Sequence, residues 1–376
     1  MLDDRLSTHA IEALAHETPF FLFSRKRLLD RLARFHRSFP DAAIHYALKA
    51  NSEPEIIRTL ARAGCGFEAA SKYELHMLQE ARVPPDKIIY GTSVKPASHI
   101  REFFEYGVDR FAFDCPSELE KIAAAAPNSR VYARIVVNDA GSVFKFSEKF
   151  GADKATAVSL LRRARELGLT PYGLSFHVGS QARNASAWAA GLADIAEVMT
   201  ELRSLSIELE VLNLGGGFPC HYASSEYVPD LCEVAQLTRE RYAALPYRPR
   251  LILEPGRAIV AEAGVLVASV IARVTRGNQT WLFLDAGVYN GLFEAMAYQG
   301  STRYPIESLR LSNAFGEALF ALAGPTGDSP DVITREALLP ADTDVGDRVI
   351  IRNAGAYSLS VTSTFNGFPK PAVHFV

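Results

Sequence analysis

The sequence predicts an α/β protein, a (β/α)8 TIM barrel followed by a mostly antiparallel β domain. From about residue 25 to 260, short runs rich in β-branched and aromatic residues alternate with longer helical patterns that carry charged faces, which is typical of βαβ units. After residue 260 the pattern changes to short alternating runs separated by turns, as in antiparallel strands. We therefore expect a barrel over residues 25–260 and a β domain built from residues 1–24 and 261–376.

The barrel prediction depends on the number of strand and helix units. Candidate strands are 42–50, 65–70, 88–91, 109–114, 130–137, 172–178, 208–216 and 249–255. Helical patterns between them include 53–64, 71–81, 117–126, 154–168 and 187–205. Eight strands with intervening helices are what a (β/α)8 barrel needs.

The β domain is predicted from four later runs, 264–277, 280–289, 347–355 and 371–376. The strand-like segment 19-PFFLFS-24 precedes the barrel. If it pairs with the later strands, the β domain is discontinuous in sequence.

Composition limits the possible partners. The chain has 376 residues and is 48% hydrophobic, enough for a large core and two domains. A net charge of −3 without a basic stripe favours small-molecule partners over nucleic acid. No signal peptide or long apolar run is present, so we expect a soluble cytoplasmic protein without membrane contact. The cysteines lack metal-type spacing, which predicts no metal site and suits a reducing compartment: Cys65, Cys115, Cys220 and Cys232.

Polar and glycine residues follow the predicted strands where a barrel places its reactive groups, at the C-terminal ends. Each has an ordinary structural explanation when taken alone, since a lysine after a strand is usually a solvated strand end. Their joint placement favours an active site. The residues are Lys49, Glu68, Arg134, His177, Ser180, Gly215, Gly216, Gly217, Glu254, Gly256 and Arg257.

The last two strand ends predict a phosphate site. Glycines at 215–217 and in the EPGR turn let backbone N–H groups approach an anion, and a following helix start would add a favourable dipole. A phosphate together with Lys49 suggests pyridoxal phosphate, whose aldehyde bonds to a lysine amine and which withdraws electrons from an α-carbon. Glu254 is the candidate partner of its pyridine nitrogen, and His177 is the candidate to stack on its ring.

Seven motifs in order resemble the fold-type III pyridoxal-phosphate decarboxylases, which share the alanine racemase-like fold. They are YALKAN, GFEAAS, SFHVGSQ, LNLGGGFP, EPGR, GPTxD and 355-GAYSLSVTSTFNGF-368. The resemblance runs from about residue 18 to the C-terminus and is closest to ornithine decarboxylase and its lysine, diaminopimelate and arginine relatives. It implies decarboxylation of a basic L-amino acid or a derivative, in polyamine or specialised amine metabolism.

The resemblance also implies roles for single residues. Lys49 would carry the cofactor, Glu68 would support it, and Arg134 would lie near it. Asp328 and Phe365 would enter the active site of the partner subunit in a head-to-tail homodimer and contact the substrate. The phosphate would be held by Ser180, the backbone at Gly215 to Gly217, Arg257 and Tyr357, and Gly256 would also bind the cofactor.

Two positions depart from the family pattern. Gly327 stands where ornithine decarboxylase-like enzymes have a cysteine that returns a proton to the α-carbon. Another group or water must then supply that proton, or the product is an aldehyde or ketone formed by transamination or oxidation. Ala297 stands where bacterial relatives tend to have an aspartate for the distal amine of the substrate, with Gln299 or Glu294 as candidate replacements.

Three other interpretations stay open. In one of them Gly327 is an engineered or incidental loss of the cysteine. In another the chain is an amino-acid racemase, which needs a second base opposite Lys49. In the third it is a non-catalytic homologue that binds a regulator or partner of a true decarboxylase.

Overall fold

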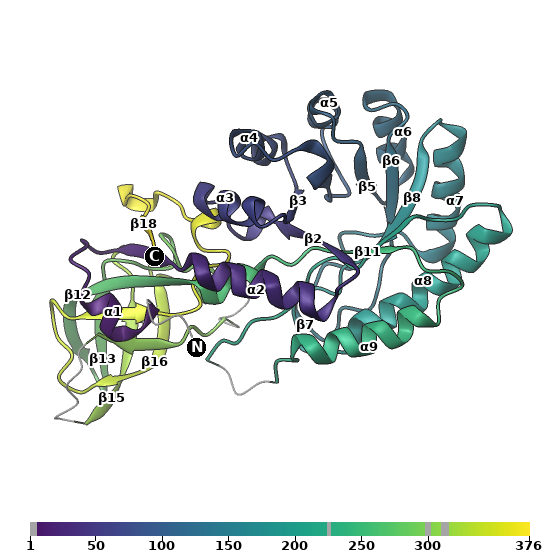
Figure 1. Cartoon of the computed structure of the whole chain (residues 1–376). Helices are drawn as coiled ribbons and strands as arrows, with labels where there is room; N and C mark the ends of the chain where they lie inside the picture. Colours follow the sequence, from purple (N-terminus) through teal and green to yellow (C-terminus); the bar gives the residue numbers. More distant parts are fainter. Residues whose placement is uncertain (1–5, 224–226, 298–301, 310–315) are drawn as a thin grey trace. The chain divides into compact units, whose positions relative to one another are not determined.

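The computed structural model describes residues 6–223, 227–297, 302–309 and 316–376 (Figure 1). The chain divides into two compact units. We call Leu32–Pro219 with Tyr227–Gly256 the barrel unit. Met1–Arg31, Cys220–Glu226 and Arg257–Val376 form the β unit.

Parallel strands close the predicted barrel in the order β10-β11-β2-β3-β4-β5-β6-β8 (Figure 1). All eight overlap the runs that the sequence indicates, so the (β/α)8 prediction is confirmed. Their bounds are β2 (Ala42–Ala47), β3 (Gly66–Ala69), β4 (Ile88–Tyr90), β5 (Arg110–Phe113), β6 (Arg130–Arg134), β8 (Thr170–Ser175), β10 (Val211–Asn213) and β11 (Arg250–Leu253).

Longer helices alternate with these strands along the chain, and several begin at a side-chain cap. Ser71 and Asp153 accept hydrogen bonds from backbone N–H groups in the first turns of α4 and α7. Among the described residues no helix has both the length and the apolar character needed to cross a membrane. The helices are α2 (Arg25–Ser38), α3 (Pro54–Arg62), α4 (Lys72–Glu80), α5 (Ala97–Tyr106), α6 (Pro116–Ala125), α7 (Lys154–Glu166), α8 (Ala187–Ser204) and α9 (Leu231–Ala243), with the short α1 (Thr8–Glu12), α10 (Arg257–Val260) and α11 (Phe293–Met296).

Side chains from several barrel strands form a buried cluster. In a barrel of this kind the interior is a packed core, and the residues that do chemistry lie at the C-terminal strand ends. The members of the cluster are Ile89, Ala112, Tyr132, Tyr172, Val211 and Ile252.

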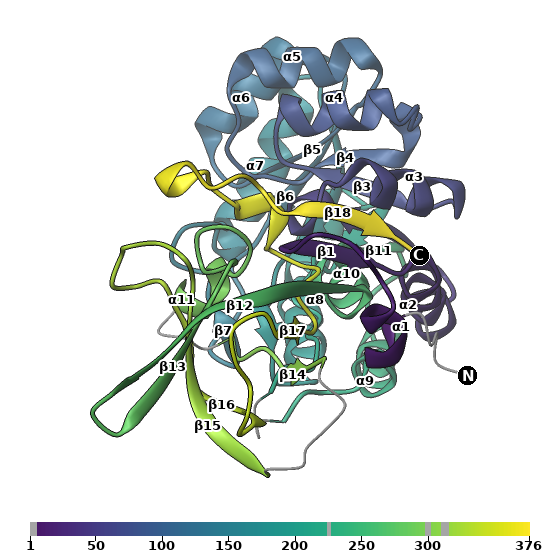
Figure 2. The same ribbon diagram turned by 90° about the vertical axis from the view of Figure 1, so that its left-hand side faces the viewer.

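The β unit is one sheet with the strand order β14-β17-β12-β13-β15-β16, and β1 lies between β12 and β18 (Figure 2). The predicted strand at 19–24 therefore pairs with the C-terminal strands. Most pairs are antiparallel, but β1–β18 and β13–β15 are parallel. The bounds are β1 (Phe20–Phe23), β12 (Gly264–Arg276), β13 (Gln279–Leu284), β14 (Ile306–Ser308), β15 (Glu317–Ala323), β16 (Val332–Pro340), β17 (Arg348–Ile351) and β18 (Ala372–Phe375).

Some elements differ from those expected. The strand predicted for 280–289 ends at Leu284, because the chain turns where the Gly287 N–H donates to Asn290 Oδ1 at 2.6 Å. A small sheet of β7 (Ser142–Phe144) and β9 (Ser180–Ala182) was not predicted. A helix begins directly after the turn that follows β11, since α10 starts at Arg257, whereas α9 starts only at Leu231.

Candidate active site

Lys49 and Glu68 form an ion pair at the end of β2 and β3. The Lys49 Nζ lies 2.6 Å from Glu68 Oε2. The lysine side chain is 44% exposed, whereas the glutamate is 2% exposed. A buried carboxylate thus holds an accessible amine at the barrel rim. Gly91 after β4 permits this packing, because a Cβ there would lie 2.6 Å from Glu68 Cγ.

Asn213 connects Glu254 to the glycine turn. Its Nδ2 donates to Glu254 Oε1 at 2.6 Å, and its Oδ1 accepts from the Gly215 N–H at 2.9 Å. The backbone N–H of Glu254 in turn donates to the Gly215 carbonyl at 2.8 Å. One buried amide side chain therefore fixes both the carboxylate and the turn, a role that the sequence motif LNLGGG did not reveal.

The glycine turn leaves no room for side chains. Gly215 and Gly217 have φ of +64° and +94°, which L-residues rarely adopt. A Cβ on Gly216 would lie 2.7 Å from the Glu254 carbonyl oxygen and 3.1 Å from His177 Nε2. The turn, Glu254 and His177 are therefore neighbours at the rim.

His177 presents a neutral aromatic ring at the rim. Its Nδ1 accepts a hydrogen bond from the Gly179 N–H at 3.0 Å, and the ring of Phe146 meets it edge to face with centroids 5.0 Å apart. Burial lowers the pKa of His177 well below its usual value, and the positive charges of Arg134 and Lys49 add to this. The imidazole is uncharged at neutral pH, as stacking on a ring face requires.

Electrostatics at the rim favour protonation of Glu254. Burial raises the pKa of this carboxyl from 4.5 to about 7, and repulsion from Glu68 acts in the same direction. The positive charges of Lys49 and Arg134 oppose the shift. Because burial leaves the Glu254 carboxylate with little solvent around its charge, a cationic group bound beside it would interact with it strongly.

These barrel residues fit pyridoxal phosphate. The rim offers an accessible amine, an acid suited to a pyridine nitrogen, a neutral aromatic ring and a turn whose glycines leave a cradle for an anion. Lys49, Glu254, His177 and Gly215–Gly217 are the residues that would hold it. These assignments stay predictions, as do those of Arg134, Gly256 and Ser180, which begins β9.

A second polar cluster surrounds Arg257 in the β unit. The guanidinium donates to both carboxylate oxygens of Glu294 at 2.6 and 2.7 Å and to the Tyr222 hydroxyl at 2.8 Å. It also lies 4.7 Å from the ring centroid of Tyr357. Both charged side chains are buried, at 3% and 8% exposure. Glu294 is therefore committed to Arg257, which corrects the expectation that it could replace the missing aspartate.

The Arg257–Glu294 pair predicts a large stability effect. Glu294→Ala leaves a buried guanidinium without its carboxylate, so we expect the free energy of unfolding to fall by about 3–5 kcal/mol. Urea denaturation of the cofactor-free protein measures this loss. The matched control is Glu307→Ala, because Glu307 also pairs with an arginine, Arg352, but is 44% exposed. It should cost about 1 kcal/mol or less. Equal losses in the two variants would contradict the prediction.

Asp331 organises the turn 324-GPTGDSPD-331. Its carboxylate accepts from the N–H groups of Thr326 and Val288 at 3.1 and 2.9 Å, and it is 2% exposed. Cβ atoms on Gly287 or Gly324 would lie 2.2 or 2.3 Å from its Oδ1. Those glycines are needed for packing, and the role of Asp331 was not predicted.

Packing does not require a glycine at position 327. No atom lies within 4 Å of a Cβ built on it, and its φ is not in the left-handed region.

The neighbouring Asp328 accepts a hydrogen bond from the Tyr289 hydroxyl, which raises the pKa of that tyrosine. The rings of Tyr289 and Phe365 lie 4.5 Å apart. Tyr289 thus contacts both Asp328 and Phe365, two residues of the β unit that were predicted to meet the substrate. The sequence analysis did not identify Tyr289 itself. Gln299 lies outside the described residues.

Known proteins resemble nearly the whole chain. A family profile described as the pyridoxal-binding domain of pyridoxal-dependent decarboxylases matches residues 25–261. The lysine/ornithine decarboxylase of Selenomonas ruminantium is 34% identical over 370 residues, 98% of this chain and 92% of that enzyme. The crystal structure of SrLDC in complex with PLP and cadaverine has a TM-score of 0.91 and 33% identity, and the match covers 100% of this chain and 95% of that one.

A relative with a different kind of name is also similar. Antizyme inhibitor 2 of Xenopus laevis is 31% identical over 368 residues, which cover 95% of this chain and 80% of that protein. Proteins of this degree of sequence similarity therefore include some named as decarboxylases and one named as an antizyme inhibitor.

Proposed function

Since the chain belongs to the fold-type III pyridoxal-phosphate-dependent amino-acid decarboxylases, we propose that it decarboxylates a basic L-amino acid of the ornithine or lysine type, or a derivative of one. The observation that carries this proposal is the barrel rim. There Lys49 pairs with Glu68 while Asn213 ties Glu254 to the glycine turn.

Each barrel residue has a defined task in this proposal. Pyridoxal phosphate, when bound, supplies the electron sink that makes loss of carbon dioxide from an amino acid possible. Lys49 provides the amine that binds the cofactor, and Glu68 orients that amine. Glu254 holds a proton at the pyridine nitrogen, and Asn213 fixes the carboxylate for that task. His177 covers one face of the ring without adding a charge.

We assign the far end of the substrate to the β unit of a second subunit. Asp328 offers a carboxylate for a distal cation, with Tyr289 and Phe365 beside it. The relatives' names, lysine/ornithine decarboxylase among them, support a basic substrate. Ala297 removes one expected carboxylate, and Glu294 is occupied by Arg257, so a modified or larger basic amino acid is included in the proposal.

Gly327→Cys should change the product rather than the fold. A cysteine side chain fits there, because nothing lies within 4 Å of the Cβ position. Its thiol can donate a proton to the α-carbon after carbon dioxide leaves, so we expect the share of simple amine among the products to rise. Gly327→Ser is the matched control, since it adds similar bulk with a far weaker acid. An unchanged product mixture in the cysteine variant would show that Gly327 does not set the outcome.

Product analysis tests the proposed reaction. The purified protein is incubated with pyridoxal phosphate and a panel of ornithine, lysine, arginine and diaminopimelate, and products and cofactor are identified by mass spectrometry. Decarboxylation can give a simple amine, an aldehyde or ketone together with pyridoxamine phosphate, or, by reaction with dissolved oxygen, a carbonyl compound together with peroxide. Inverted configuration without carbon dioxide would instead identify a racemase.

A non-catalytic role is the second candidate, because the antizyme inhibitor relative favours it. The Lys49–Glu68 ion pair and the Glu254–Asn213 hydrogen bond support catalysis instead. The same incubation separates the two candidates: a regulatory homologue would leave every amino acid of the panel unchanged.

A further inference from the structure

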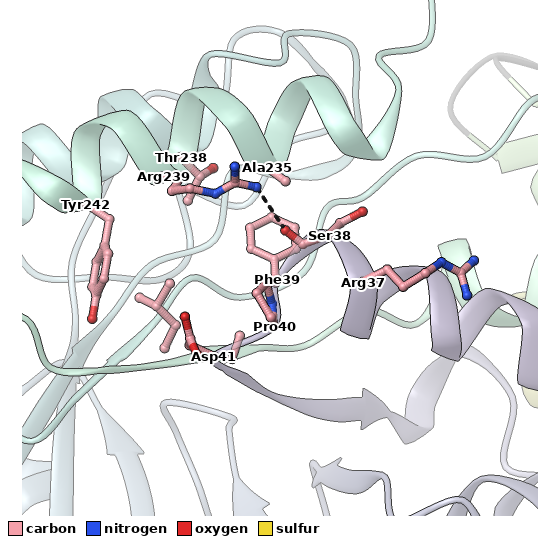
Figure 3. A pocket seen from close by; sticks show the side chains of 11 residues that line it. Arg37, Ser38, Phe39, Pro40, Asp41, Ala235, Thr238, Arg239 and Tyr242 are labelled. Carbon is pink, nitrogen blue, oxygen red and sulfur yellow. Dashed lines mark hydrogen bonds between the residues drawn. The ribbon is translucent and has the colours of Figure 1, made fainter.

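A cavity lies in the barrel unit, at the opposite end of the strands from Lys49 (Figure 3). It has a volume of about 360 Å³ and lies where the end of α2 and the first residues of β2 and β11 meet α9. β2 contains six residues, each rising about 3.3 Å, so the cavity is roughly 20 Å from Lys49. It is therefore separate from the candidate active site.

The cavity combines apolar walls with charges of opposite sign. Phe39, Ala235 and Leu251 are buried and give it an apolar lining. Figure 3 shows Arg239 on the α9 side and Asp41 on the other side of the cavity. Within the part of the chain that the structure describes, neither side chain forms an ion pair, and Arg239 makes only a 3.5 Å contact to the Ser38 carbonyl.

Thr238 lines the cavity on the same helix as Arg239, but a ligand cannot reach its hydroxyl. The residue is 1% exposed, and its Oγ1 is closed off from the cavity. The exposed guanidinium of Arg239 is therefore the donor on α9 that a carboxylate in the cavity can reach.

We propose that this cavity binds a free α-amino acid, with the carboxylate at Arg239 and the ammonium at Asp41. The side chain of the amino acid would lie against Phe39 and Leu251. A small inorganic anion is disfavoured by Asp41, and a polyamine is disfavoured by Arg239, whereas a zwitterion matches both charges. The volume lies at the lower end of the range for small-molecule sites, which suits a molecule of this size.

Amide hydrogen exchange of the cofactor-loaded protein tests this site separately from the active site. We expect at least one of the common L-amino acids to slow exchange in residues 37–42 and 235–242, while inorganic phosphate and putrescine do not. Arg239→Ala and Asp41→Ala should each abolish this protection.

Arg241→Ala is the matched control, because Arg241 is exposed on the same helix but does not line the cavity. It removes the same charge and should leave the protection intact. The proposal is overturned if no amino acid protects these segments, if phosphate or putrescine protects them equally, or if Arg241→Ala abolishes the protection as Arg239→Ala does. The result is independent of the proposed decarboxylation, since the segments differ from those around Lys49.

Discussion

Lys49→Ala is expected to abolish cofactor attachment and to lower the rate of carbon dioxide release by at least ~10³-fold, as removal of a covalent catalytic group does. Lys49 is the accessible amine at the barrel rim, held by the buried Glu68. The absorption band of lysine-bound cofactor should disappear in this variant. Reduction of the wild-type protein with borohydride, followed by digestion and mass spectrometry, should find the cofactor on the peptide that contains Lys49.

The control for this variant is Lys87→Ala. Lys87 is an exposed lysine at the other end of the barrel, directly before β4. Its removal should leave both the absorption band and the rate unchanged. Cofactor found on another lysine, or an absorption band that survives in Lys49→Ala, would refute the role of Lys49.

Glu254→Gln is expected to lower kcat by about 10²–10³-fold, because an amide cannot stabilise a protonated pyridine nitrogen as a carboxylate does. Asn213 should still contact residue 254, and Lys49 is untouched, so cofactor binding should survive. The absorption band and the rate are measured on the same sample. If the absorption band is lost together with activity, Glu254 serves mainly to bind the cofactor rather than to stabilise the protonated pyridine nitrogen.

The same variant should change how stability depends on pH. The pKa of Glu254 is raised from 4.5 to about 7 in the folded chain, so the folded chain binds this proton more tightly than the unfolded chain. The free energy of unfolding of the cofactor-free protein therefore falls as pH rises from 4.5 through 7, and Glu254→Gln removes that contribution. Relative to wild type, the variant should gain stability at about pH 8 and little at about pH 4.5.

A second buried carboxyl, that of Glu74, also makes the free energy of unfolding depend on pH. Burial and repulsion from Glu68 raise its pKa to about 7 as well. The variant should therefore show a shallower pH dependence rather than none. Urea denaturation at the two pH values measures the change, and an equal difference between variant and wild type at both values would contradict it.

The barrel was predictable because its strands and helices keep distinct periodicities along the sequence. The strands flanking the GPTGD turn were not. β15 has the sequence EALFALA, whose residues favour helices, yet it pairs with β13 and β16. Tertiary pairing overrides local preference in such a segment, and no local signal marks it as a strand.

The site was predictable where a residue follows directly from its place at a strand end, as with Lys49 and Glu254. The supporting contacts were not, because they join residues far apart in the chain. Asn213 reaches Glu254 across 41 positions, and Tyr289 reaches Asp328 across 39. The same limit explains why Glu294 looked available for substrate before its pairing with Arg257 was known.

The central claim is that this chain removes the carboxyl group of a basic amino acid through Lys49. The most direct test is the release of labelled carbon dioxide from carboxyl-labelled ornithine and lysine by wild-type protein and by Lys49→Ala, with pyridoxal phosphate present. We predict release from at least one substrate by the wild type and none above background by the variant. No release by the wild type from any basic amino acid, or equal release by the two proteins, would contradict the claim.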